Sequence, residues 1–310
     1  MLIDLHAHYP MQLVPEKQDT THQHLKRWKT ERFRARVVAI ISRLANYEGP
    51  DDEPGVTPEL MVEGEVGAAL SVLYQPFDEI DFSEDYGSPP ASRYFRDLID
   101  QLEIVEEHAA RSDVKVTVAH NRAELHAALD RGEPALVHCV EGGLHLGASK
   151  EEVAANVRTL HERGVAYITV AHLFWRGVAT NAPAIPFLPD WLYRLLFPQP
   201  RGVGLSPLGR ALVEAMVEDR ILVDITHMSE VATAEVLGLL DTLDPDRTVP
   251  VIASHGGCRL GSEEYCLTDD TIRRVQERGG VIGLLLCDHH RSPTRPTPAA
   301  RSRRRTTACP

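Results

Sequence analysis

The feature that most constrains this chain is a regular alternation of short apolar runs with longer amphipathic stretches. The apolar runs are rich in β-branched residues, and those at 221–226 (ILVDIT) and 249–254 (VPVIAS) are almost continuously apolar. Runs of this kind are typical of parallel strands that are covered on both faces. We predict eight strands: Leu2–His8, Ala68–Tyr74, Val114–Ala119, Ala135–Val140, Ala166–Ala171, Ile221–Thr226, Val249–Ser254 and Val281–Cys287.

The intervening stretches carry the end signals of α-helices. Asn121 and Ser149 are each followed three residues later by glutamate, the spacing of a capping box, and Ser206 precedes a proline, as an N-cap often does. Long amphipathic helices are predicted over Leu25–Leu44 and Arg93–Ala110. Three glycines stand where a helix would end in the left-handed conformation: Gly132, Gly164 and Gly279.

Strands and helices that alternate in this way imply right-handed β-α-β units around a parallel sheet. An open doubly wound sheet is the main rival to a barrel, but neither GxGxxG nor GxxxxGK(S/T) follows any predicted strand. The expected fold is therefore α/β, a TIM-type (β/α)8 barrel, and 310 residues suit a single barrel. We expect the proline-rich stretch 176–207 to fold over one face of this barrel.

Charge and composition exclude several classes of partner. A formal net charge of -12 argues against nucleic acid, whose phosphates would be repelled. The sequence has no apolar run of about 18 residues and no signal peptide, so no membrane partner is expected. Five cysteines without a CxxC pair indicate reduced thiols and a cytoplasmic protein.

The end of the chain differs in composition from the rest. Residues 291–310 contain six Arg, four Pro and no acid. Because such a segment cannot bury a core, we divide the chain into a barrel domain, 1–290, and a disordered Arg/Pro-rich tail, 291–310. The change is abrupt, so we favour a gene-model artefact over a genuine basic tail that binds polyanions.

Four of the predicted strands end in residues that can bind a metal. The first carries His6 and His8, the strand at 135–140 is followed by Glu141, and the strands at 221–226 and 249–254 are followed by His227 and His255. In a barrel these side chains converge on one mouth. Imidazole and carboxylate without thiolate suit Zn²⁺, with Mn²⁺, Fe²⁺ or Co²⁺ as alternatives. Five ligands exceed the need of one tetrahedral zinc, so we expect two metal ions that share Glu141.

The other histidines fall outside this pattern. His172 ends the strand at 166–171 and should face the same mouth, so it is a candidate for a substrate-binding or supporting role. His22 and His24 lie in a polar stretch and are interpreted as solvent-facing. Six more are interpreted as structural: His108, His120, His126, His138, His145 and His161.

Taken in order, these segments resemble the membrane (renal) dipeptidase family of zinc hydrolases, a branch of the metal-dependent amidohydrolases. The resemblance covers most of residues 1–290 and rests on DLHAHYP, VEGG at 140–143, GVAYITVAHLFWRGVATN, GLSPLGRALVEAMVEDRILVDITHMSE and PVIASHGG. It implies two zinc ions bridged by Glu141, with His6 and position 8 on one zinc and His227 and His255 on the other. It also implies that His172 contacts the substrate.

The sequence departs from this family at three places. His8 stands where the family has an aspartate, which removes one negative charge and should leave the metals more electrophilic but less tightly held. Cys266 stands where a family arginine grips the substrate; Arg259 lies nearby and is the candidate to replace it. The family's last strand, with its GxDxDG-like segment and acid/base aspartate, does not follow Val281–Cys287. The resemblance thus makes Val114–Ala119 an accessory strand and leaves the barrel without its last βα unit.

The resemblance implies a zinc-dependent hydrolase of dipeptidase type, which cleaves a dipeptide or small amide with a metal-activated bridging hydroxide. Glu141 and His172 would have the catalytic roles. Two alternatives stay open: another amidohydrolase, acting on a lactone, β-lactam or cyclic amide, and a truncated metal-binding protein without activity. The expected partner is a small-molecule substrate, and because related enzymes are often dimers, a homodimer is compatible with the resemblance.

Overall fold

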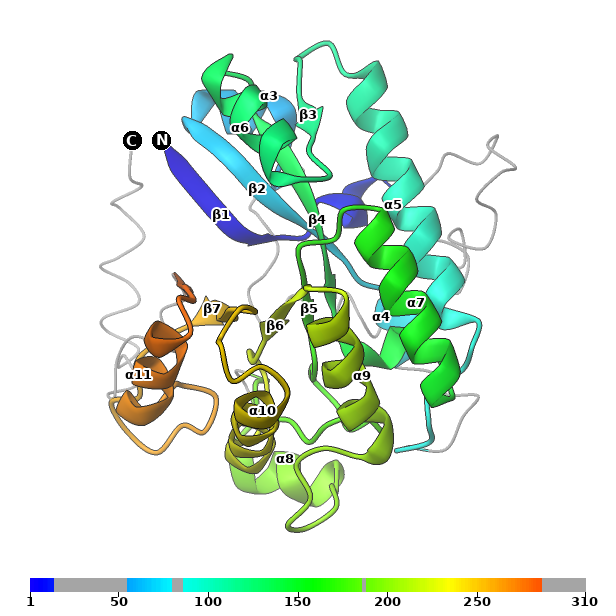
Figure 1. The fold of residues 1–310 in the computed structure, drawn as a ribbon, viewed down its shortest axis with the longest axis vertical. Helices are drawn as coiled ribbons and strands as arrows, with labels where there is room; N and C mark the ends of the chain where they lie inside the picture. Colours follow the sequence, from blue (N-terminus) through cyan, green and yellow to red (C-terminus); the bar gives the residue numbers. More distant parts are fainter. Residues whose placement is uncertain (14–54, 80–85, 186–187, 286–310) are drawn as a thin grey trace.

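A parallel sheet that curves into a nearly closed barrel forms the centre of the molecule (Figure 1). The computed structural model describes residues 1–13, 55–79, 86–185 and 188–285. Every predicted strand is present, most of them shorter than predicted. Their bounds are β1 (Leu2–Ala7), β2 (Val66–Leu73), β3 (Thr117–Val118), β4 (Ala135–Glu141), β5 (Tyr167–Thr169), β6 (Leu222–Asp224), β7 (Val251–Gly256) and β8 (Ile282–Leu284).

The strand order confirms a TIM-type barrel with one accessory strand. The sheet runs β1-β2-β4-β5-β6-β7-β8, all parallel, while β3 pairs with the first residues of β4 beside this path. β1 lies against β7 and β8, which brings the two ends of the path together. Within the described ranges no further strand lies between β8 and β1, as the resemblance implied.

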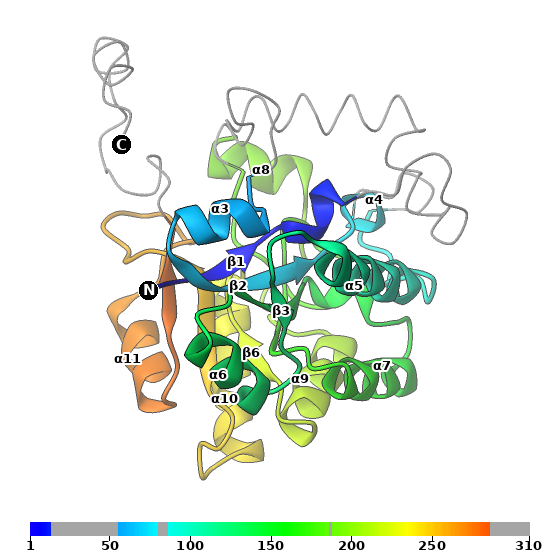
Figure 2. The same cartoon turned by 90° about the horizontal axis from the view of Figure 1, so that it is seen from above.

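Helices surround the strands (Figure 2). They are α3 (Pro58–Glu63), α4 (Pro76–Glu79), α5 (Tyr94–Arg111), α6 (Arg122–Asp130), α7 (Lys150–Glu162), α8 (Asp190–Leu196), α9 (Pro207–Glu218), α10 (Glu230–Leu243) and α11 (Asp269–Glu277), with 3-10 turns η1 (Tyr9–Gln12) and η3 (Gly143–His145). The capping signals are confirmed, because Asn121 and Ser149 each accept a hydrogen bond from the backbone N–H three residues on. The predicted helix at 93–110 is α5, and the three predicted glycines all have positive φ.

The described part of the stretch 176–207 packs against the carboxyl end of β6, which agrees with the prediction that it folds over one face of the barrel. The Ala182 N–H donates to the His227 carbonyl, and Asn181 forms an isolated bridge with Met228. This contact places the long loop and α8 beside residues that follow β6. The stretch therefore lies over the face of the barrel where the strands end.

Two of the apolar clusters show the direction in which the strand side chains point. One fills the barrel and consists of Val72, Tyr74, Cys139, Tyr167 and Ile252. The larger one lies between the sheet and the helices and includes Val140. Since neighbouring side chains of a strand face opposite sides, Glu141 has the same facing as Cys139, whereas His138 points toward the helices. The same strand thus serves two different environments.

Several predictions concern residues outside the described ranges. These are the helix over Leu25–Leu44, the histidines at 22 and 24, and the tail 291–310, so the domain boundary at 290 stays a prediction. In the described part of the chain, no helix is both long and apolar enough to cross a membrane.

Candidate metal centre

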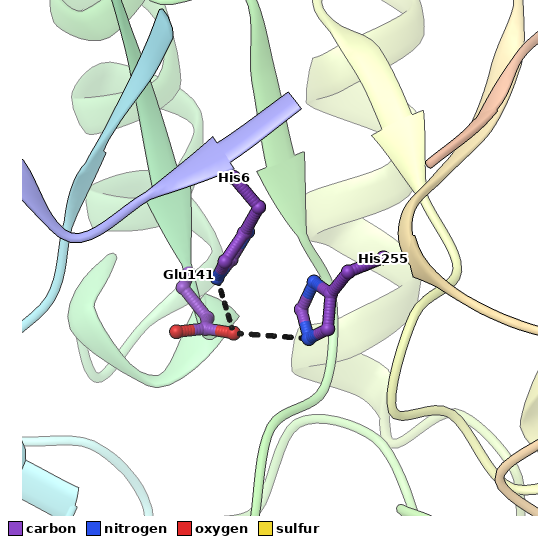
Figure 3. A group of neighbouring side chains, drawn as sticks. All are labelled: His6, Glu141 and His255. Carbon is purple, nitrogen blue, oxygen red and sulfur yellow. Dashed lines mark ion pairs between the residues drawn. The ribbon is translucent and has the colours of Figure 1, made fainter. Parts of the chain in front are cut away.

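Glu141 lies at the centre of the group that the strand ends predicted. It is the last residue of β4, and its side chain is 1% exposed. Figure 3 shows His6 from β1 and His255 from β7 pointing to its carboxylate. Five imidazoles place Nε2 near a carboxylate oxygen: His6 at 3.2 Å, His172 at 3.3 Å, His227 at 3.4 Å, His8 at 3.5 Å and His255 at 3.9 Å.

The donor atoms fall into two overlapping groups that share this carboxylate. His6 and His255 form one with Glu141, and His172 and His227 form the other, with all donor atoms of a group within 4.8 Å of one another. Tetrahedral coordination by Zn²⁺ at its usual bond lengths separates donors by about 3.3 Å. The His227 and His255 Nε2 atoms are themselves 3.0 Å apart. The spacing is therefore compatible with that of donor atoms around a metal ion.

Unsatisfied buried atoms support the same interpretation. Glu141 Oε2 and His6 Nε2 are buried and make no hydrogen bond within the described structure. Burial raises the pKa of Glu141, but the facing imidazoles of His172 and His6 outweigh burial and hold that pKa well below its usual value. Glu141 is thus a buried anion with an oxygen free for a cation, and a bound metal would remove the penalty of leaving it unpaired.

The tautomer of His6 is set by its neighbour. Its Nδ1 lies 2.9 Å from the Tyr167 hydroxyl, which donates its own proton to the Leu5 carbonyl at 2.9 Å. The hydroxyl must then accept from the imidazole, so His6 carries its proton on Nδ1. This leaves the Nε2 lone pair directed at Glu141, which is the arrangement of a metal-ligating histidine.

A buried aspartate holds the three strands that bring His227 and His255 together. Asp224, on β6, accepts from the Thr169 hydroxyl at 2.6 Å and from the backbone N–H groups of Thr226 and Ser254, each at 3.0 Å. These bonds join the carboxyl ends of β5, β6 and β7. Burial lowers the pKa of His227 and His255, which favours the neutral form that can bind a metal.

The backbone turns sharply at two positions in the centre. Gly142 directly follows the shared carboxylate with φ of 90°, a conformation that glycine tolerates without a steric penalty. His227 has φ of 67° although it is not glycine. Left-handed non-glycine residues are uncommon and persist where surrounding contacts over-determine them. Here the chain accepts this conformation at a predicted ligand.

His172 differs from the other imidazoles because it lies between two carboxylates. Its Nε2 faces Glu141, and its Nδ1 is 2.5 Å from Glu79 Oε2. Burial lowers the pKa of His172, but Glu141 and Glu79 together raise it to about 10. Both ring nitrogens of His172 face a carboxylate, so each is placed to donate a hydrogen bond.

Glu79 was not predicted from the sequence. Its carboxylate is buried and also accepts from the Tyr74 hydroxyl at 2.7 Å and the Phe174 N–H at 2.9 Å. Glu79 ends α4, which begins two residues after Tyr74, the end of a predicted strand. The signal that could have found it is the strand-end rule extended to an acid a few residues further along.

Comparison with known proteins identifies the family. The sequence model of the membrane dipeptidases (Peptidase family M19) matches residues 1–297. The chain belongs to this family.

Two curated relatives of this dipeptidase family come from fungi. Dipeptidase tcpJ of Claviceps purpurea is 26% identical over 72% of this chain and 46% of its own length. Dipeptidase verJ of Clonostachys rogersoniana is 25% identical over 72% of this chain and 52% of its own length. The chain therefore spans about half the length of the curated relatives that it matches.

Solved structures agree on the fold. A metallo peptidase from Rhodobacter sphaeroides, liganded with a phosphinate mimic of the dipeptide L-Ala-D-Ala, has a TM-score of 0.62 at 18% identity, and the match covers 94% of this chain and 77% of that one. The probable dipeptidase PvdM from Pseudomonas aeruginosa has a TM-score of 0.58 at 19% identity, with 79% of this chain and 56% of that one covered.

Membership in a metallopeptidase family implies a metal cofactor. The residues fit a metal ion, because the possible donors are imidazoles and a single buried carboxylate, Glu141. In addition, Glu141 Oε2 and His6 Nε2 make no hydrogen bond within the described structure. His6, His8, Glu141, His227 and His255 are the side chains that could hold it.

Arg259, the candidate to replace the substrate-binding arginine of the family, forms hydrogen bonds within its own loop. Its Nε donates to the Cys266 carbonyl and its Nη2 to the Glu264 carbonyl, each at 2.9 Å, and Nη1 contacts the Glu230 carboxylate. The side chain of Cys266 is buried. The guanidinium thus braces its own loop, and a role of Arg259 in substrate binding stays a prediction.

Proposed function

We propose that this chain is a two-zinc hydrolase of dipeptidase type, acting on a dipeptide or a comparably small amide. One observation carries the proposal: a buried carboxylate, Glu141, is faced by five imidazoles at the mouth of a barrel that belongs to the membrane dipeptidase family. A shared carboxylate with histidines on either side is what two adjacent divalent ions require.

The positions around Glu141 agree only in part with the predicted distribution of ligands. His8 faces Oε2 at 3.5 Å, whereas His6, His227 and His255 all face Oε1, and His227 and His255 lie 3.0 Å from each other. The family resemblance assigns His6 and His8 to one zinc and His227 and His255 to the other, and we keep this assignment as part of the proposal. When bound, two zinc ions would lower the pKa of a shared water and polarise the scissile carbonyl.

The chain's own contribution to the reaction centres on His172. Its charged imidazole, held by Glu79, would donate a hydrogen bond to the oxygen on which negative charge develops. One such donor contributes about 3 kcal/mol to stabilising the transition state. Because the Glu79 carboxylate accepts a hydrogen bond from Nδ1, it keeps the His172 ring oriented with Nε2 toward the mouth. The GxDxDG aspartate of the family has no counterpart among the described residues.

A second enzymatic function is favoured by the loop after β7. Cys266 replaces the family arginine, and Arg259 is bonded to its own loop, so no cationic fork for a free carboxylate is in evidence there. A cyclic amide, β-lactam or lactone lacks the terminal carboxylate that such a fork would bind. This substrate class is therefore the alternative to a dipeptide.

The experiment is a substrate comparison with the full chain loaded with zinc. Dipeptides of L,L and L,D configuration are compared with cyclic amides, β-lactams and lactones, and product release is followed by chromatography. We expect dipeptide turnover that Glu141→Gln abolishes and that His126→Ala, on the exposed side of α6, leaves unchanged. Turnover of cyclic substrates alone would favour the alternative, and zinc binding without turnover would favour an inactive metal-binding protein.

Two expectations accompany this proposal. A cytoplasmic location rests on the cysteines, three of which are free thiols in the described structure. A homodimer rests on the resemblance alone and would be measured by sedimentation.

A further inference from the structure

A second cluster of metal-binding side chains lies on the other side of β4. His138 precedes Glu141 by three residues and therefore points away from the barrel interior, toward Glu106 on α5 and His120 in the turn between β3 and α6. One nitrogen of each ring and one carboxylate oxygen lie within 4.8 Å of one another. None of these three residues belongs to the group around Glu141.

The buried histidine of this cluster has no hydrogen bond. His138 is 0% exposed, and neither of its ring nitrogens has a hydrogen-bond partner within the described structure. Its Nε2 lies 3.8 Å from Glu106 Oε1, too far for a hydrogen bond. Burial lowers the pKa of His138, so the ring is neutral and one nitrogen offers a lone pair. A buried polar group left in this state costs about 1–3 kcal/mol.

The second histidine is arranged as metal ligands usually are. His120 Nδ1 is 3.2 Å from Glu124 Oε2, while its Nε2 is 3.0 Å from Glu106 Oε1. A carboxylate on one ring nitrogen fixes the tautomer and directs the other nitrogen at the ion. Gly164 allows the chain to pack closely against His120, since a Cβ at position 164 would lie 2.4 Å from the Cα of His120.

The carboxylate supplies the negative charge. The imidazoles of His138 and His120 and the guanidinium of Arg163 lower the pKa of Glu106 to about 2. Arg163 Nη2 donates to Oε2 at 3.0 Å, which leaves Oε1 for the two histidines. The nearby guanidinium should weaken cation binding relative to the centre on Glu141, because it repels a divalent ion.

We propose that Glu106, His120 and His138 form a second, peripheral site for one divalent transition-metal ion of the Zn²⁺ type. The two separations from Glu106 Oε1, 3.0 Å and 3.8 Å, bracket the spacing of about 3.3 Å expected in tetrahedral zinc coordination. The His120 side chain is 39% exposed, which leaves one side open for a water ligand. A bound ion would join α5, the β3–α6 turn and β4. This proposal does not depend on the hydrolytic function.

The test counts metal ions with and without the outer ligand. Metal-free full-length protein is titrated with Zn²⁺ alone by equilibrium dialysis and elemental analysis. The half-exposed ligand is removed in His120→Ala, and His126→Ala is the matched control, an exposed histidine on the adjacent helix α6. We expect wild type and the control to bind one zinc more per chain than His120→Ala, at the weakest step of the titration.

Two further variants keep the result interpretable. Glu106→Gln preserves the shape of the side chain, removes its charge, and should lose the same zinc even if His120→Ala folds poorly by circular dichroism. In Glu141→Gln the central sites are impaired, but the step that depends on His120 should remain. Equal zinc binding by folded His120→Ala, folded Glu106→Gln and wild type would overturn the proposal.

Discussion

Glu141 and His172 illustrate how a few contacts assign different roles to neighbouring residues. Both are buried, yet the imidazoles around Glu141 keep it anionic, while the two carboxylates around His172 keep it cationic. A buried anion surrounded by imidazoles is suited to bind metal. A cation fixed by Glu79 is suited to donate hydrogen bonds. The difference in charge between the two residues arises from the groups that face them and not from their degree of burial.

Glu79→Gln tests the support that His172 receives. The amide keeps the shape but removes the charge beside the imidazole, so His172 loses orientation and positive charge. We expect kcat to fall about 10–100-fold, as with other groups that orient site residues, while zinc content stays constant. Steady-state kinetics with elemental analysis would measure both. A loss of zinc equal to the loss of rate would assign Glu79 to metal retention instead.

His8→Asp tests the unusual ligand. An aspartate would restore the family's negative charge and should tighten zinc binding, by about 10-fold if one charge in this setting contributes on the order of 1.4 kcal/mol. Competition with a chromogenic chelator measures the Kd. His126→Ala serves again as the control, and a Kd for His8→Asp equal to that of wild type would contradict the assignment of position 8 as a ligand.

At the scale of the elements, polar side chains fix the junctions between helices and strands. Asp244 ends α10 and is buried; it accepts from the backbone N–H groups of Thr248 and Val249, each at 2.9 Å, and from Arg278 at 3.2 Å. It thereby ties α10, the start of β7 and the end of α11 into one unit.

Asp244→Asn should destabilise the fold by about 1–3 kcal/mol, because a charged acceptor of several hydrogen bonds is lost. Burial raises the pKa of Asp244, but hydrogen bonds from Val249 and Thr248 and the charge of Arg278 outweigh burial and hold the folded pKa below its usual value. The contribution is therefore fully present above the ordinary pKa of an unfolded aspartate and is lost as the pH falls through the lower folded pKa. Urea unfolding of both proteins from pH 7 to pH 3 measures the difference. An unchanged difference across that range would contradict the account.

The elements also show which parts of the fold and of the site could be predicted from the sequence. The strands and capped helices were predictable because apolar periodicity and capping residues act locally, and the strand-end rule brought His6, Glu141, His227 and His255 together. Glu79 was missed because α4 turns it back toward His172, a long-range contact with no local pattern. The sequence interpretation placed His120 and His138 among the structural histidines, since no local pattern shows that Glu106 on α5 faces them.

At the scale of the whole molecule, the proposed ligands at the barrel mouth come from β1, β4, the residues after β6, and β7. A metal that bridges these distant segments links the first strand to the second half of the chain. Metal binding should therefore stabilise the entire fold and not only the site.

Chelation should reveal this coupling. With free zinc at about 100 times its Kd, the folded state gains about 2.7 kcal/mol per independent site. We expect the Tm of zinc-loaded protein to fall when a chelator is added and to recover with excess zinc, followed by circular dichroism. Glu141→Gln should show a much smaller change. A Tm that is indifferent to zinc would show that the strand ends do not meet at a metal.

The most direct test of the two-metal centre is the hydrolysis rate of a dipeptide measured against zinc bound per chain. For wild type the rate should rise to a plateau once two tightly bound zinc ions are present, and for Glu141→Gln it should stay at background. A rate that is independent of zinc, or that survives the loss of Glu141, would contradict the account.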